Sequence, residues 1–415
     1  MRTSYPAYKS TAIPWLPEMP EHWELIGLNL LFRDNKNKNK GMVESLVLSL
    51  SYGNIIRKQK EENFGLIPES FETYQILEPG YIVMRLTDLQ NDKRSLRVGY
   101  VKERGIITSA YTGLVPGKVD SKYYYYLLHY LDIRKHFYSL GGGVRQSSDY
   151  NEIKKTKVPL PPLPEQTAIA NYLDAKTEQI NRFIEKKEKL IALLKEQKQA
   201  VINELLEDKE GKWERRKLKY CVTKVGSGVT PSGGATVYKD SGIPLLRSQN
   251  IHNDRLELDD VAYITQEVHE SMGGSKVLPG DVLLNITGGS LGRCFYATEE
   301  LGEANVNQHV SIIRPHSKKI KTEFLQLLLI SEIGSKQIWR EQTGSGREGL
   351  NGGAIKNFVF PIPSIENQAD VIDNIRNETS PIDIAISRIE KEIEKVKELK
   401  QSLIAEVVTG KIKVE

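Results

Sequence analysis

The amino-acid sequence contains an internal repeat, and this repeat constrains the fold more than any other feature. When the chain is displaced against itself by 202 positions, the stretch VPLPPLPEQ at 158–166 lies over FPIPSIENQ at 360–368. The match continues downstream, where 198–206 follows 400–408 almost position by position. A sequence repeat indicates a structural unit that occurs twice. We therefore expect two half-chains, each a variable globular region followed by a similar helical segment.

Proline-rich strips separate the globular regions from the helical segments. Proline is excluded from helix interiors and disfavours helical geometry in the preceding residue. Each strip therefore predicts an extended linker that leads into a helix at Glu165 or Glu366. In each repeat we expect a short helix and then a long one, roughly 176–206 and 380–408. Pro381 fits the first turn of the second long helix, and Gly410 fits its C-terminal cap.

Apolar residues in the long helices alternate by four and three positions, which is the period of a coiled-coil seam. Lys187 and Lys198 break the seam in the first helix, and Lys400 breaks it in the second. Two such seams can bury each other, and a globular region between them favours antiparallel pairing. The alternative is two amphipathic helices that each pack on their own domain. A helix of about 31 residues is about 46 Å long, enough to act as a spacer. The predicted seam residues are Ile180, Ile184, Ile191, Leu194, Val201 and Leu205, with Ile382, Ile386, Ile389, Ile393, Val396, Leu403 and Val407.

Both globular regions read as α+β. Strand-like runs at 80–86 and 280–286 follow a Pro-Gly turn, and helix-like stretches follow at 122–138 and 323–339. The expected fold is therefore α+β, with two globular domains alternating with two long helices that pair as an antiparallel coiled coil. The expected boundaries are 1–160 and 209–363 for the globular domains and 161–208 and 364–415 for the helical repeats.

Composition excludes some classes of protein and suggests one kind of ligand. The chain is 39% hydrophobic and 27% charged, which argues against a disordered chain, and it has no apolar run of membrane-spanning length. Only two cysteines, Cys221 and Cys294, make a disulfide framework unexpected, so we expect a cytoplasmic protein without a membrane role. The formal charge of +4 is uneven: it is 0 over 165–206, −4 over 366–406 and +8 elsewhere. Positive globular regions suit phosphate binding, although ordinary solubility charge is the alternative.

Polar strips rich in Arg, Asn, Gln, Ser and Thr interrupt both globular regions. These side chains can hydrogen-bond to base edges in the major groove, although any single strip could be a solvated loop. Lys36, Lys38 and Lys40 alternate with asparagine and indicate either a phosphate-contacting loop or a disordered tip. The candidate DNA-binding residues are Arg85, Thr87, Asp88, Gln90, Asn91, Lys93, Arg94, Ser109, Tyr111 and Arg145 in the first region, and Arg247, Gln249, Asn250, Thr287, Gly288, Ser290, Arg293, Asn307, Gln308, His309 and Arg347 in the second.

Motifs for covalent chemistry are missing from the sequence. No G-x-x-x-x-G-K-[ST] occurs, and Gly226-Ser227-Gly228 is a lone G-x-G without a third glycine in register. The seven histidines form no H-x-x-x-H pair and no cysteine joins them at zinc spacing. We therefore expect neither a catalytic site nor a metal site in this chain.

The arrangement resembles the DNA-specificity subunit of type I restriction–modification enzymes over essentially the whole chain. The resemblance rests on the opening YKSTAIPWL at 8–16 and PEHWE at 20–24, on the repeat boundary PLPPLPEQ at 159–166, and on GDVL at 280–283. The Thr-Gly, Gly-Arg and Asn-Gln-His strips at 287–288, 292–293 and 307–309 resemble that family's second target-recognition domain.

The resemblance implies a non-catalytic subunit that binds double-stranded DNA and reads one half of a bipartite site with each domain. It also implies partners: two methyltransferase subunits, which bring S-adenosylmethionine and flip adenine out of the duplex, and a restriction subunit that uses ATP and Mg. The first domain lacks the Thr-Gly and Asn-Gln-His strips of the second, so we expect an asymmetric target. The alternatives are an autonomous coiled-coil DNA-binding or architectural protein, a DNA-modifying enzyme with an unfamiliar site, and a scaffold that binds no nucleic acid.

Overall fold

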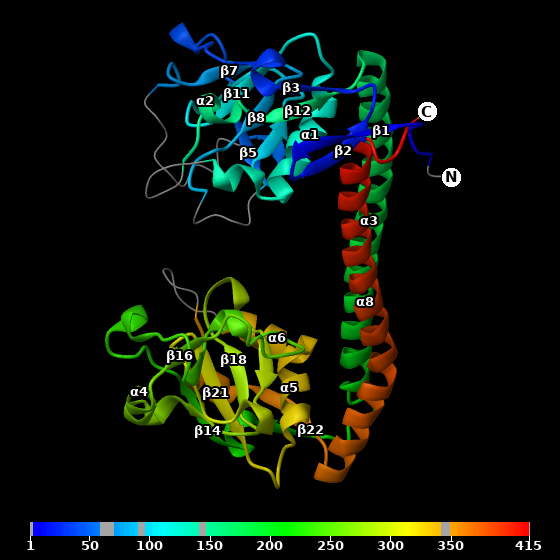
Figure 1. The fold of residues 1–415 in the computed structure, drawn as a ribbon. Coiled ribbons are helices and arrows are strands. Elements are labelled where there is room, and N and C mark those ends of the chain that lie inside the picture. The colour runs from blue at the N-terminus through cyan, green and yellow to red at the C-terminus, as the bar shows by residue number, and fades with distance from the viewer. Residues whose placement is uncertain (1–2, 59–69, 90–95, 141–146, 342–348, 415) are drawn as a thin grey trace. The chain divides into compact units, whose positions relative to one another are not determined.

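The computed structural model describes residues 3–58, 70–89, 96–140, 147–341 and 349–414 (Figure 1). The chain forms two compact units, one of residues 1–187 with 391–415 and one of residues 188–390. Each unit holds one globular region and part of each long helix, α3 (Leu163–Leu205) and α8 (Ile365–Val408). The fold is mixed α and β, as the sequence predicted. Within the described ranges no helix is long and apolar enough to cross a membrane.

The globular region of the first unit is built on a four-stranded antiparallel sheet in the order β4-β11-β8-β9. Smaller two-stranded sheets flank it, and α1 covers one face. The strands of the main sheet are β4 (Phe32–Asp34), β11 (Thr112–Pro116), β8 (Ile82–Met84) and β9 (Val98–Tyr100). The other elements are β1 (Tyr8–Ile13), β2 (Leu16–Pro20), β3 (Glu24–Gly27), β5 (Leu48–Ser51), β6 (Asn54–Arg57), β7 (Gln75–Leu77), β10 (Gly105–Ile107), α1 (Ser121–Ile133), α2 (Tyr150–Ile153) and β12 (Lys157–Leu160).

The second unit repeats this plan and adds a second sheet of four strands, in the order β16-β15-β20-β17. Its main sheet has the equivalent order β14-β21-β18-β19, and β13 pairs with β22 as β3 pairs with β12. The strands of that sheet are β14 (Val222–Ser227), β21 (Val310–Pro315), β18 (Val282–Asn285) and β19 (Cys294–Tyr296). The other elements are β13 (Glu214–Lys217), β15 (Ile243–Leu246), β16 (Ala262–Ile264), α4 (Gln266–Ser271), β17 (Lys276–Val277), β20 (Ala304–Val306), α5 (Thr322–Ile330), α6 (Glu332–Arg340), α7 (Gly352–Asn357) and β22 (Val359–Ile362).

A buried glutamine explains why the same motif ends both proline strips. In the second unit the side chain of Gln368, in the first turn of α8, accepts a hydrogen bond from Lys321 N (2.8 Å) and donates to Lys319 O and Pro363 O (3.0 Å each). In the first unit Gln166 accepts from Asp120 N (2.9 Å) and donates to Pro161 O (2.8 Å). We call each glutamine with these bonds the glutamine latch, because it joins a long helix to the segment entering α1 or α5.

Both long helices are continuous, so the prediction of a short helix followed by a long one is wrong. Each begins directly after its proline strip, at Leu163 and Ile365. Pro381 therefore lies inside α8 and not in its first turn. A proline there removes one backbone hydrogen bond, whose acceptor is the carbonyl of Asn377. Both residues are exposed, so water can satisfy that carbonyl while buried isoleucines on the opposite face keep the helix in place.

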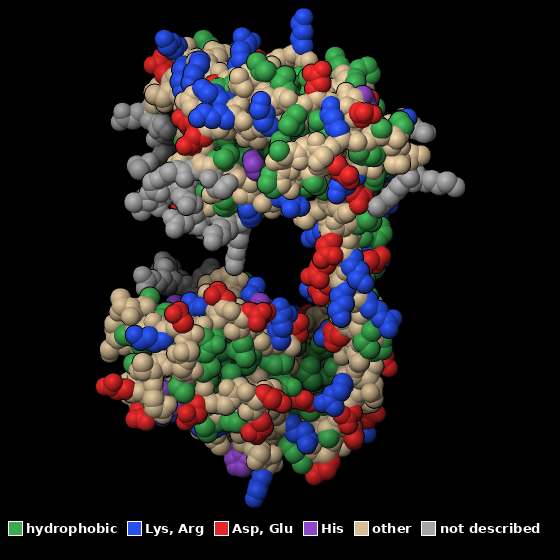
Figure 2. All heavy atoms as spheres, viewed as in Figure 1, with side chains coloured by type: hydrophobic (Ala, Val, Ile, Leu, Met, Phe, Trp, Pro, Cys, Tyr) green, Lys and Arg blue, Asp and Glu red, His purple; other side chains and the backbone are tan. Residues whose placement is uncertain are grey.

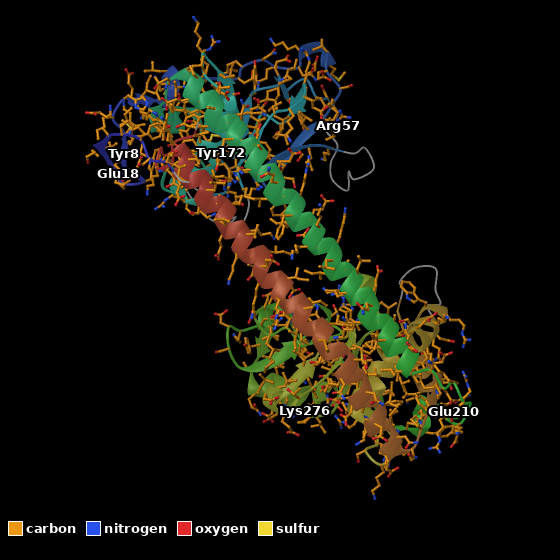
Figure 3. The ribbon with its side chains drawn as sticks, turned by 90° about the vertical axis from the view of Figure 1, so that its right-hand side faces the viewer. Tyr8, Glu18, Arg57, Tyr172, Glu210 and Lys276 are labelled. Carbon is orange, nitrogen blue, oxygen red and sulfur yellow. The ribbon has the colours of Figure 1, made fainter. Side chains whose placement is uncertain are left out.

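The C-terminal cap of α8 matches the prediction. Gly410 has φ +75, the left-handed conformation that favours glycine. Its N–H donates to Val407 O (3.2 Å) and the N–H of Lys411 donates to Glu406 O (2.8 Å), which is the hydrogen-bond pattern of a Schellman cap. Tyr8, on the β1–β2 hairpin, donates its hydroxyl to Gly410 O (3.1 Å), so the start of the chain contacts the end of α8 within the first unit (Figure 3).

Segments of α3 and α8 lie side by side within each unit (Figures 1 and 3). The three lysines that break the apolar seam all bond to the opposite helix. Lys187 pairs with Glu392 (2.8 Å) and Lys400 donates to Asn181 (2.8 Å) in the first unit, and Lys198 pairs with Asp383 (2.7 Å) in the second. Partner numbers fall on α8 as they rise on α3, so the pairing is antiparallel in both units. The alternative of helices that pack only on their own domains is excluded. The buried seam residues are Ile382, Ile386, Ile389, Ile393 and Val407, and the other predicted ones are half-buried.

Candidate nucleic-acid interface

The main sheet of each unit brings loop residues together at one edge. In an antiparallel sheet the carboxyl end of one strand lies beside the amino end of its neighbour. The carboxyl ends of β14 and β18 therefore flank the amino end of β21, and those of β4 and β8 flank the amino end of β11. Most of the predicted DNA-binding residues that the structure describes lie on the segments joined here. We call these segments the polar edge of each domain, namely 35–38, 85–88 and 108–111 in the first and 228–230, 247–249, 286–290 and 307–309 in the second.

The polar edge of the second domain contains a chain of side-chain hydrogen bonds. His309 Nδ1 lies 2.7 Å from Thr287 Oγ1, and His309 Nε2 lies 3.0 Å from the amide nitrogen of Gln308. Thr230 Oγ1 donates to Gln308 Oε1 (2.5 Å). The structure thus brings together three of the predicted residues and adds Thr230, which the sequence analysis did not select.

Gly228 explains how Thr230 reaches this cluster. Its N–H donates to Val310 O (2.9 Å), and a Cβ built on Gly228 would lie 2.1 Å from Val306 O and 2.4 Å from Asn307 O. Only glycine permits so close a backbone crossing. Gly228, the second glycine of the lone G-x-G, is therefore required by the packing of this edge, and it was the sequence signal available for the neighbouring Thr230.

Two predicted contact residues are buried and hold the backbone instead. Asn307 is 8% exposed and its side chain accepts from the N–H of His309 (3.1 Å), which closes the turn between β20 and β21. Asn250 is 1% exposed and donates to Glu257 O (3.0 Å) and Asp260 O (3.3 Å). Direct contact with DNA is therefore closed to both amides in this conformation, which corrects the expectation that they face the ligand. The sequence of a polar strip does not reveal which of its side-chain amides is buried in the folded domain.

Arg247 and Gln249 lie next to the same edge. The N–H of Asn307 donates to the carbonyl of Leu246 (3.0 Å), which places the segment after β15 beside the β20–β21 turn. Arg247 donates to the carbonyl of Asp260 (3.0 Å), and its guanidinium lies 6.0 Å from the centre of the Tyr238 ring. Gln249 is exposed and bonds to the Asp260 carboxylate (3.3 Å). Both side chains therefore have internal partners that a nucleic acid would have to share or replace.

The β18–β19 loop carries the remaining predicted residues of the second domain. Gly288 has φ +68 and is exposed, and Ser290 is half-buried. Arg293 lies at the base of this loop and lines a groove of about 810 Å³ between α5, β19 and the adjoining segments of α3 and α8. Figure 2 shows hydrophobic side chains in this groove, which also contains Lys195 and His252. Arg293 is thus directed at a different surface from the Thr287–His309 cluster.

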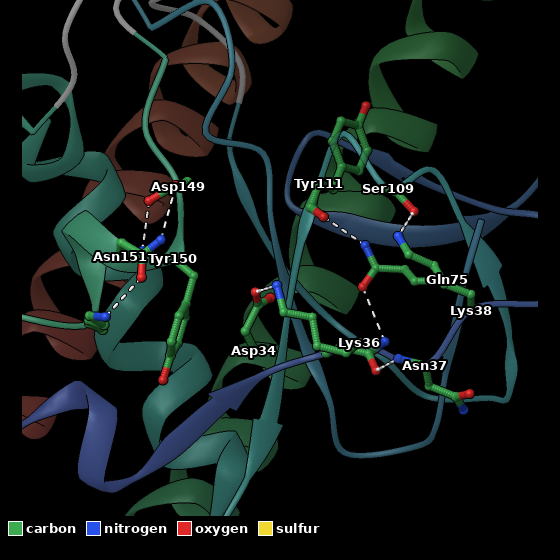
Figure 4. A network of polar contacts seen from close by, with 12 residues as sticks. Asp34, Lys36, Asn37, Lys38, Gln75, Ser109, Tyr111, Asp149, Tyr150 and Asn151 are labelled. Carbon is green, nitrogen blue, oxygen red and sulfur yellow. Dashed lines mark hydrogen bonds and ion pairs between the residues drawn. The ribbon is translucent and has the colours of Figure 1, made fainter. Parts of the chain in front are cut away.

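The polar edge of the first domain uses different chemistry (Figure 4). Lys38 Nζ donates to Ser109 Oγ (2.6 Å), and the Ser109 hydroxyl bonds in turn to Thr73 O. Lys36 is exposed and pairs with Asp34 (Figure 4). The Lys-Asn alternation is therefore an ordered segment of the edge, and the alternative of a disordered tip is excluded for Lys36 and Lys38.

Buried amides fix the backbone of this first edge. Gln75 donates to Tyr111 O (2.6 Å) and Thr108 O (3.3 Å), and its carbonyl accepts from Asn35 (3.1 Å). Asn35 also donates to Ile76 O (2.8 Å). These bonds connect the segment after β4 with the β10–β11 turn. The predicted residue Tyr111 is therefore held at this edge by its backbone carbonyl, and its half-buried ring packs against the apolar cluster that contains Leu77 and Ile107.

The strip after β8 is organised by Arg97, a residue that the sequence analysis missed. Arg97 is fully buried and donates to the carbonyls of Arg85 (3.2 Å), Thr87 (2.8 Å) and Asp88 (3.1 Å). Its own N–H donates to the Asp132 carboxylate (2.6 Å). One guanidinium thus sets the path of three predicted residues. Gln90, Asn91, Lys93, Arg94, Arg145 and Arg347 lie outside the described residues.

Comparison with known proteins adds independent information. A family model described as "Type I restriction modification DNA specificity domain" matches residues 96–193 and 210–395. The chain is 28% identical over 287 residues to the EcoBI specificity subunit of Escherichia coli, covering 63% of this chain and 59% of that protein. It is 25% identical over 269 residues to the EcoKI specificity subunit of Escherichia coli strain K12, covering 61% and 57%. These alignments span less than two thirds of the length of either relative.

Two further matches cover nearly the whole chain. The MjaVIII specificity subunit of Methanocaldococcus jannaschii is 23% identical over 420 residues, covering 96% of this chain and 94% of that protein. A chain from a solved structure described as "Structural basis underlying complex assembly and conformational transition of the type I R-M system" has a TM-score of 0.63 at 13% identity, covering 94% and 98%. At that identity the structural match shows the shared fold alone.

Proposed function

This chain belongs to the family of type I restriction–modification DNA specificity domains, and from that premise we propose that it is the DNA-reading subunit of a type I restriction–modification complex. The observation that carries the proposal is the paired polar edge: two sheets of the same order present polar loops at the equivalent edge. In this proposal the subunit performs no catalysis. We assign the target-recognition domains to residues 1–160 and 209–363, and the helical repeats to 161–208 and 364–415.

A bipartite and asymmetric target is the form of DNA that suits these two edges. The first edge offers a lysine–serine pair with a tyrosine close by, and the second offers a threonine–histidine–glutamine chain. Lysine is a cation for phosphate or guanine, whereas glutamine pairs with adenine. Different side chains at equivalent places therefore support two half-sites of different sequence.

The helical segments are the proposed docking surface for two methyltransferase subunits and a restriction subunit. Apolar side chains outside the seam remain exposed on α3 and α8, and Figure 2 shows charges of both signs around the helices. Exposed apolar groups beside mixed charges are typical of a protein–protein interface. In the assembled complex the methyltransferase brings S-adenosylmethionine and the restriction subunit brings ATP and Mg, in the cytoplasm. The exposed apolar residues are Phe183, Leu190, Leu193, Ile384 and Leu399.

The helices are also the proposed ruler between the half-sites. α3 and α8 have 43 and 44 residues and each contributes to both units. Removing one heptad from each helix, at 185–191 and 390–396, keeps the seam in phase and shortens each helix by about 10 Å. We expect the preferred spacer between half-sites to shorten by about three base pairs while both half-sites are still recognised. An unchanged spacer would refute the ruler.

The test of the function is purification of the tagged chain from its native cells, followed by mapping of adenine methylation with and without the gene. We expect a methyltransferase to co-purify and one split, asymmetric motif to lose its methylation when the gene is absent. A chain that purifies alone, with methylation unchanged, contradicts the proposal. Tight sequence-specific DNA binding by that solitary chain would instead identify an autonomous DNA-binding protein.

A further inference from the structure

The hydrogen bonds around His309 have a defined direction. The amide nitrogen of Gln308 can only donate, so His309 Nε2, 3.0 Å away, must accept. The imidazole proton is then on Nδ1 and is donated to Thr287 Oγ1 (2.7 Å). Thr230 donates to the other end of the same amide, at Oε1. The two ends of the Gln308 amide are thereby distinguished, with oxygen toward Thr230 and nitrogen toward His309.

Half of the hydrogen-bonding capacity of Gln308 remains free. A glutamine amide has two N–H donors and an oxygen with two lone pairs. One donor is used by His309 and one lone pair by Thr230, and no other bond to this side chain is found among the described residues. Gln308 is exposed, so it presents one N–H and one oxygen lone pair to solvent.

The residues that support this amide are held by contacts of their own. Thr230 is held by the close backbone crossing at Gly228, and His309 by the turn that the buried Asn307 closes. Thr287 follows a fully buried strand, and its neighbour Ile286 donates its N–H to His309 O (3.0 Å). A side chain fixed from both sides can discriminate between ligands because reorientation would break two existing bonds.

We propose that Gln308 reads an adenine through the major groove in the second half-site, and that Thr230, Thr287 and His309 are positioning residues that fix its amide. The proposal rests on the proposed DNA-reading function. Adenine presents N7 as an acceptor and N6–H as a donor, which matches one free N–H and one free oxygen lone pair. Guanine presents two acceptors there, so its O6 would face the Gln308 oxygen without a proton between them.

The first domain has no equivalent arrangement within the residues described at its polar edge. Its β10–β11 turn carries Ser109 and Tyr111, and the side chain that reaches Ser109 is Lys38. The adenine preference assigned to Gln308 therefore belongs to the second half-site alone. A change at Gln308 leaves the first half-site as an internal reference in the same molecule.

The experiment is selection of bound duplexes from a randomised pool by the complete complex of this chain with its co-purified partners. We expect Gln308→Ala to reduce preference for adenine over guanine at one base pair of the second half-site by 10- to 100-fold. Gln308→Glu, which keeps an acceptor and loses the donor, should move that position toward cytosine. Gln266→Ala is the matched control, because this exposed glutamine follows β16, whose carboxyl end lies beside the amino end of β15 and therefore away from Arg247.

The positioning role of Thr287 and Thr230 is tested separately from the proposed base contact of Gln308. Thr287→Val and Thr230→Val remove a hydroxyl at nearly constant shape, and we expect each to weaken the same single preference as Gln308→Ala. Thr287→Ser and Thr230→Ser keep the hydroxyl, so we expect both to retain the wild-type preference for adenine. Equal thermal unfolding temperatures show that the fold is unchanged, and a general loss of stability would not confine its effect to one base pair.

The outcomes distinguish a failure of the adenine assignment from a failure of the proposed DNA-reading function. A wild-type complex without any sequence preference overturns the DNA-reading function and this proposal with it. If the wild type is specific but Gln308→Ala weakens binding to all duplexes equally, Gln308 is a phosphate contact, and only the adenine assignment is overturned. An unchanged preference at every position in Gln308→Ala overturns it as well.

Discussion

Replacing Gln368 by alanine tests whether the glutamine latch holds the second domain on its helix. The substitution removes three hydrogen bonds and leaves the N–H of Lys321 and the carbonyls of Lys319 and Pro363 without a partner in a site where Gln368 is fully buried. A typical bond contributes about 1 kcal/mol and an unpaired buried group costs about 1–3 kcal/mol. Some of these groups gain water, so we expect a loss of about 3–5 kcal/mol.

The two latches give the prediction a ranking as well as a size. Gln166 makes two such bonds where Gln368 makes three, so Gln166→Ala should cost about 1 kcal/mol less in its own unit. Hydrogen exchange measured by mass spectrometry resolves α1 and α5 separately and reports the local free energy of opening. Gln197→Ala, at an exposed position of α3, is the control and should change it by less than about 0.5 kcal/mol. Unchanged exchange in α5, or a larger loss from Gln166→Ala, would show the reasoning to be mistaken.

Three further substitutions test the seam, the core and the polar edge. Lys198→Glu places like charges opposite Asp383 and should cost about 1 kcal/mol in urea unfolding, and adding Asp383→Lys should recover it; no recovery would contradict the observed antiparallel register. Burial, and secondarily a neighbouring lysine, lowers the pKa of His129 to about 4, so stability should fall by at most about 3 kcal/mol as pH drops from 6.5 to 4, because the unfolded chain takes up the proton first. In His129→Gln that part of the pH dependence should vanish, and an identical profile would exclude His129 as its source. Gly228→Ala puts a Cβ 2.1 Å from a backbone oxygen and should cost about 1–3 kcal/mol together with specificity in the proposed second half-site, whereas Gly226→Ala, whose Cβ would meet only the Lys224 side chain at 3.9 Å, should do neither.

Periodic signals in the sequence predicted the large features of the fold. The 202-residue repeat predicted two half-chains of similar plan, and the four-three spacing, together with the globular region between the helices, predicted the antiparallel helix pair. The spacing is a local pattern and the repeat is a comparison of the sequence with itself. Both can therefore be recognised without knowing which distant residues are in contact. The predicted break between a short and a long helix was wrong because it, too, was based on local sequence alone. Pro381 looked like a start, and only the burial of isoleucines on both sides of it shows why the helix continues.

The candidate sites were predicted less completely because they depend on contacts between distant segments. Arg97 lies beyond the strip it organises, and Thr230 is 78 positions from its partner Gln308. Nothing in the residues around Asn250 distinguishes a buried amide from an exposed one, and its burial follows from carbonyls that are 7 and 10 positions away. Residue type thus indicates the kind of chemistry at an edge, whereas the tertiary fold decides which side chains present it.

The two ends of each main sheet make different kinds of contact. In the second unit the amino end of β21 carries the polar edge, and Lys319 and Lys321, which Gln368 holds, follow its carboxyl end. Mutations that alter what the edge recognises therefore leave the latch untouched. Because the same glutamine attaches each globular region to its long helix, a globular region placed between two copies of this motif meets the same kind of contacts as the one it replaces. The polar edge can therefore be changed as one unit while the attachment of that unit to the long helices is kept.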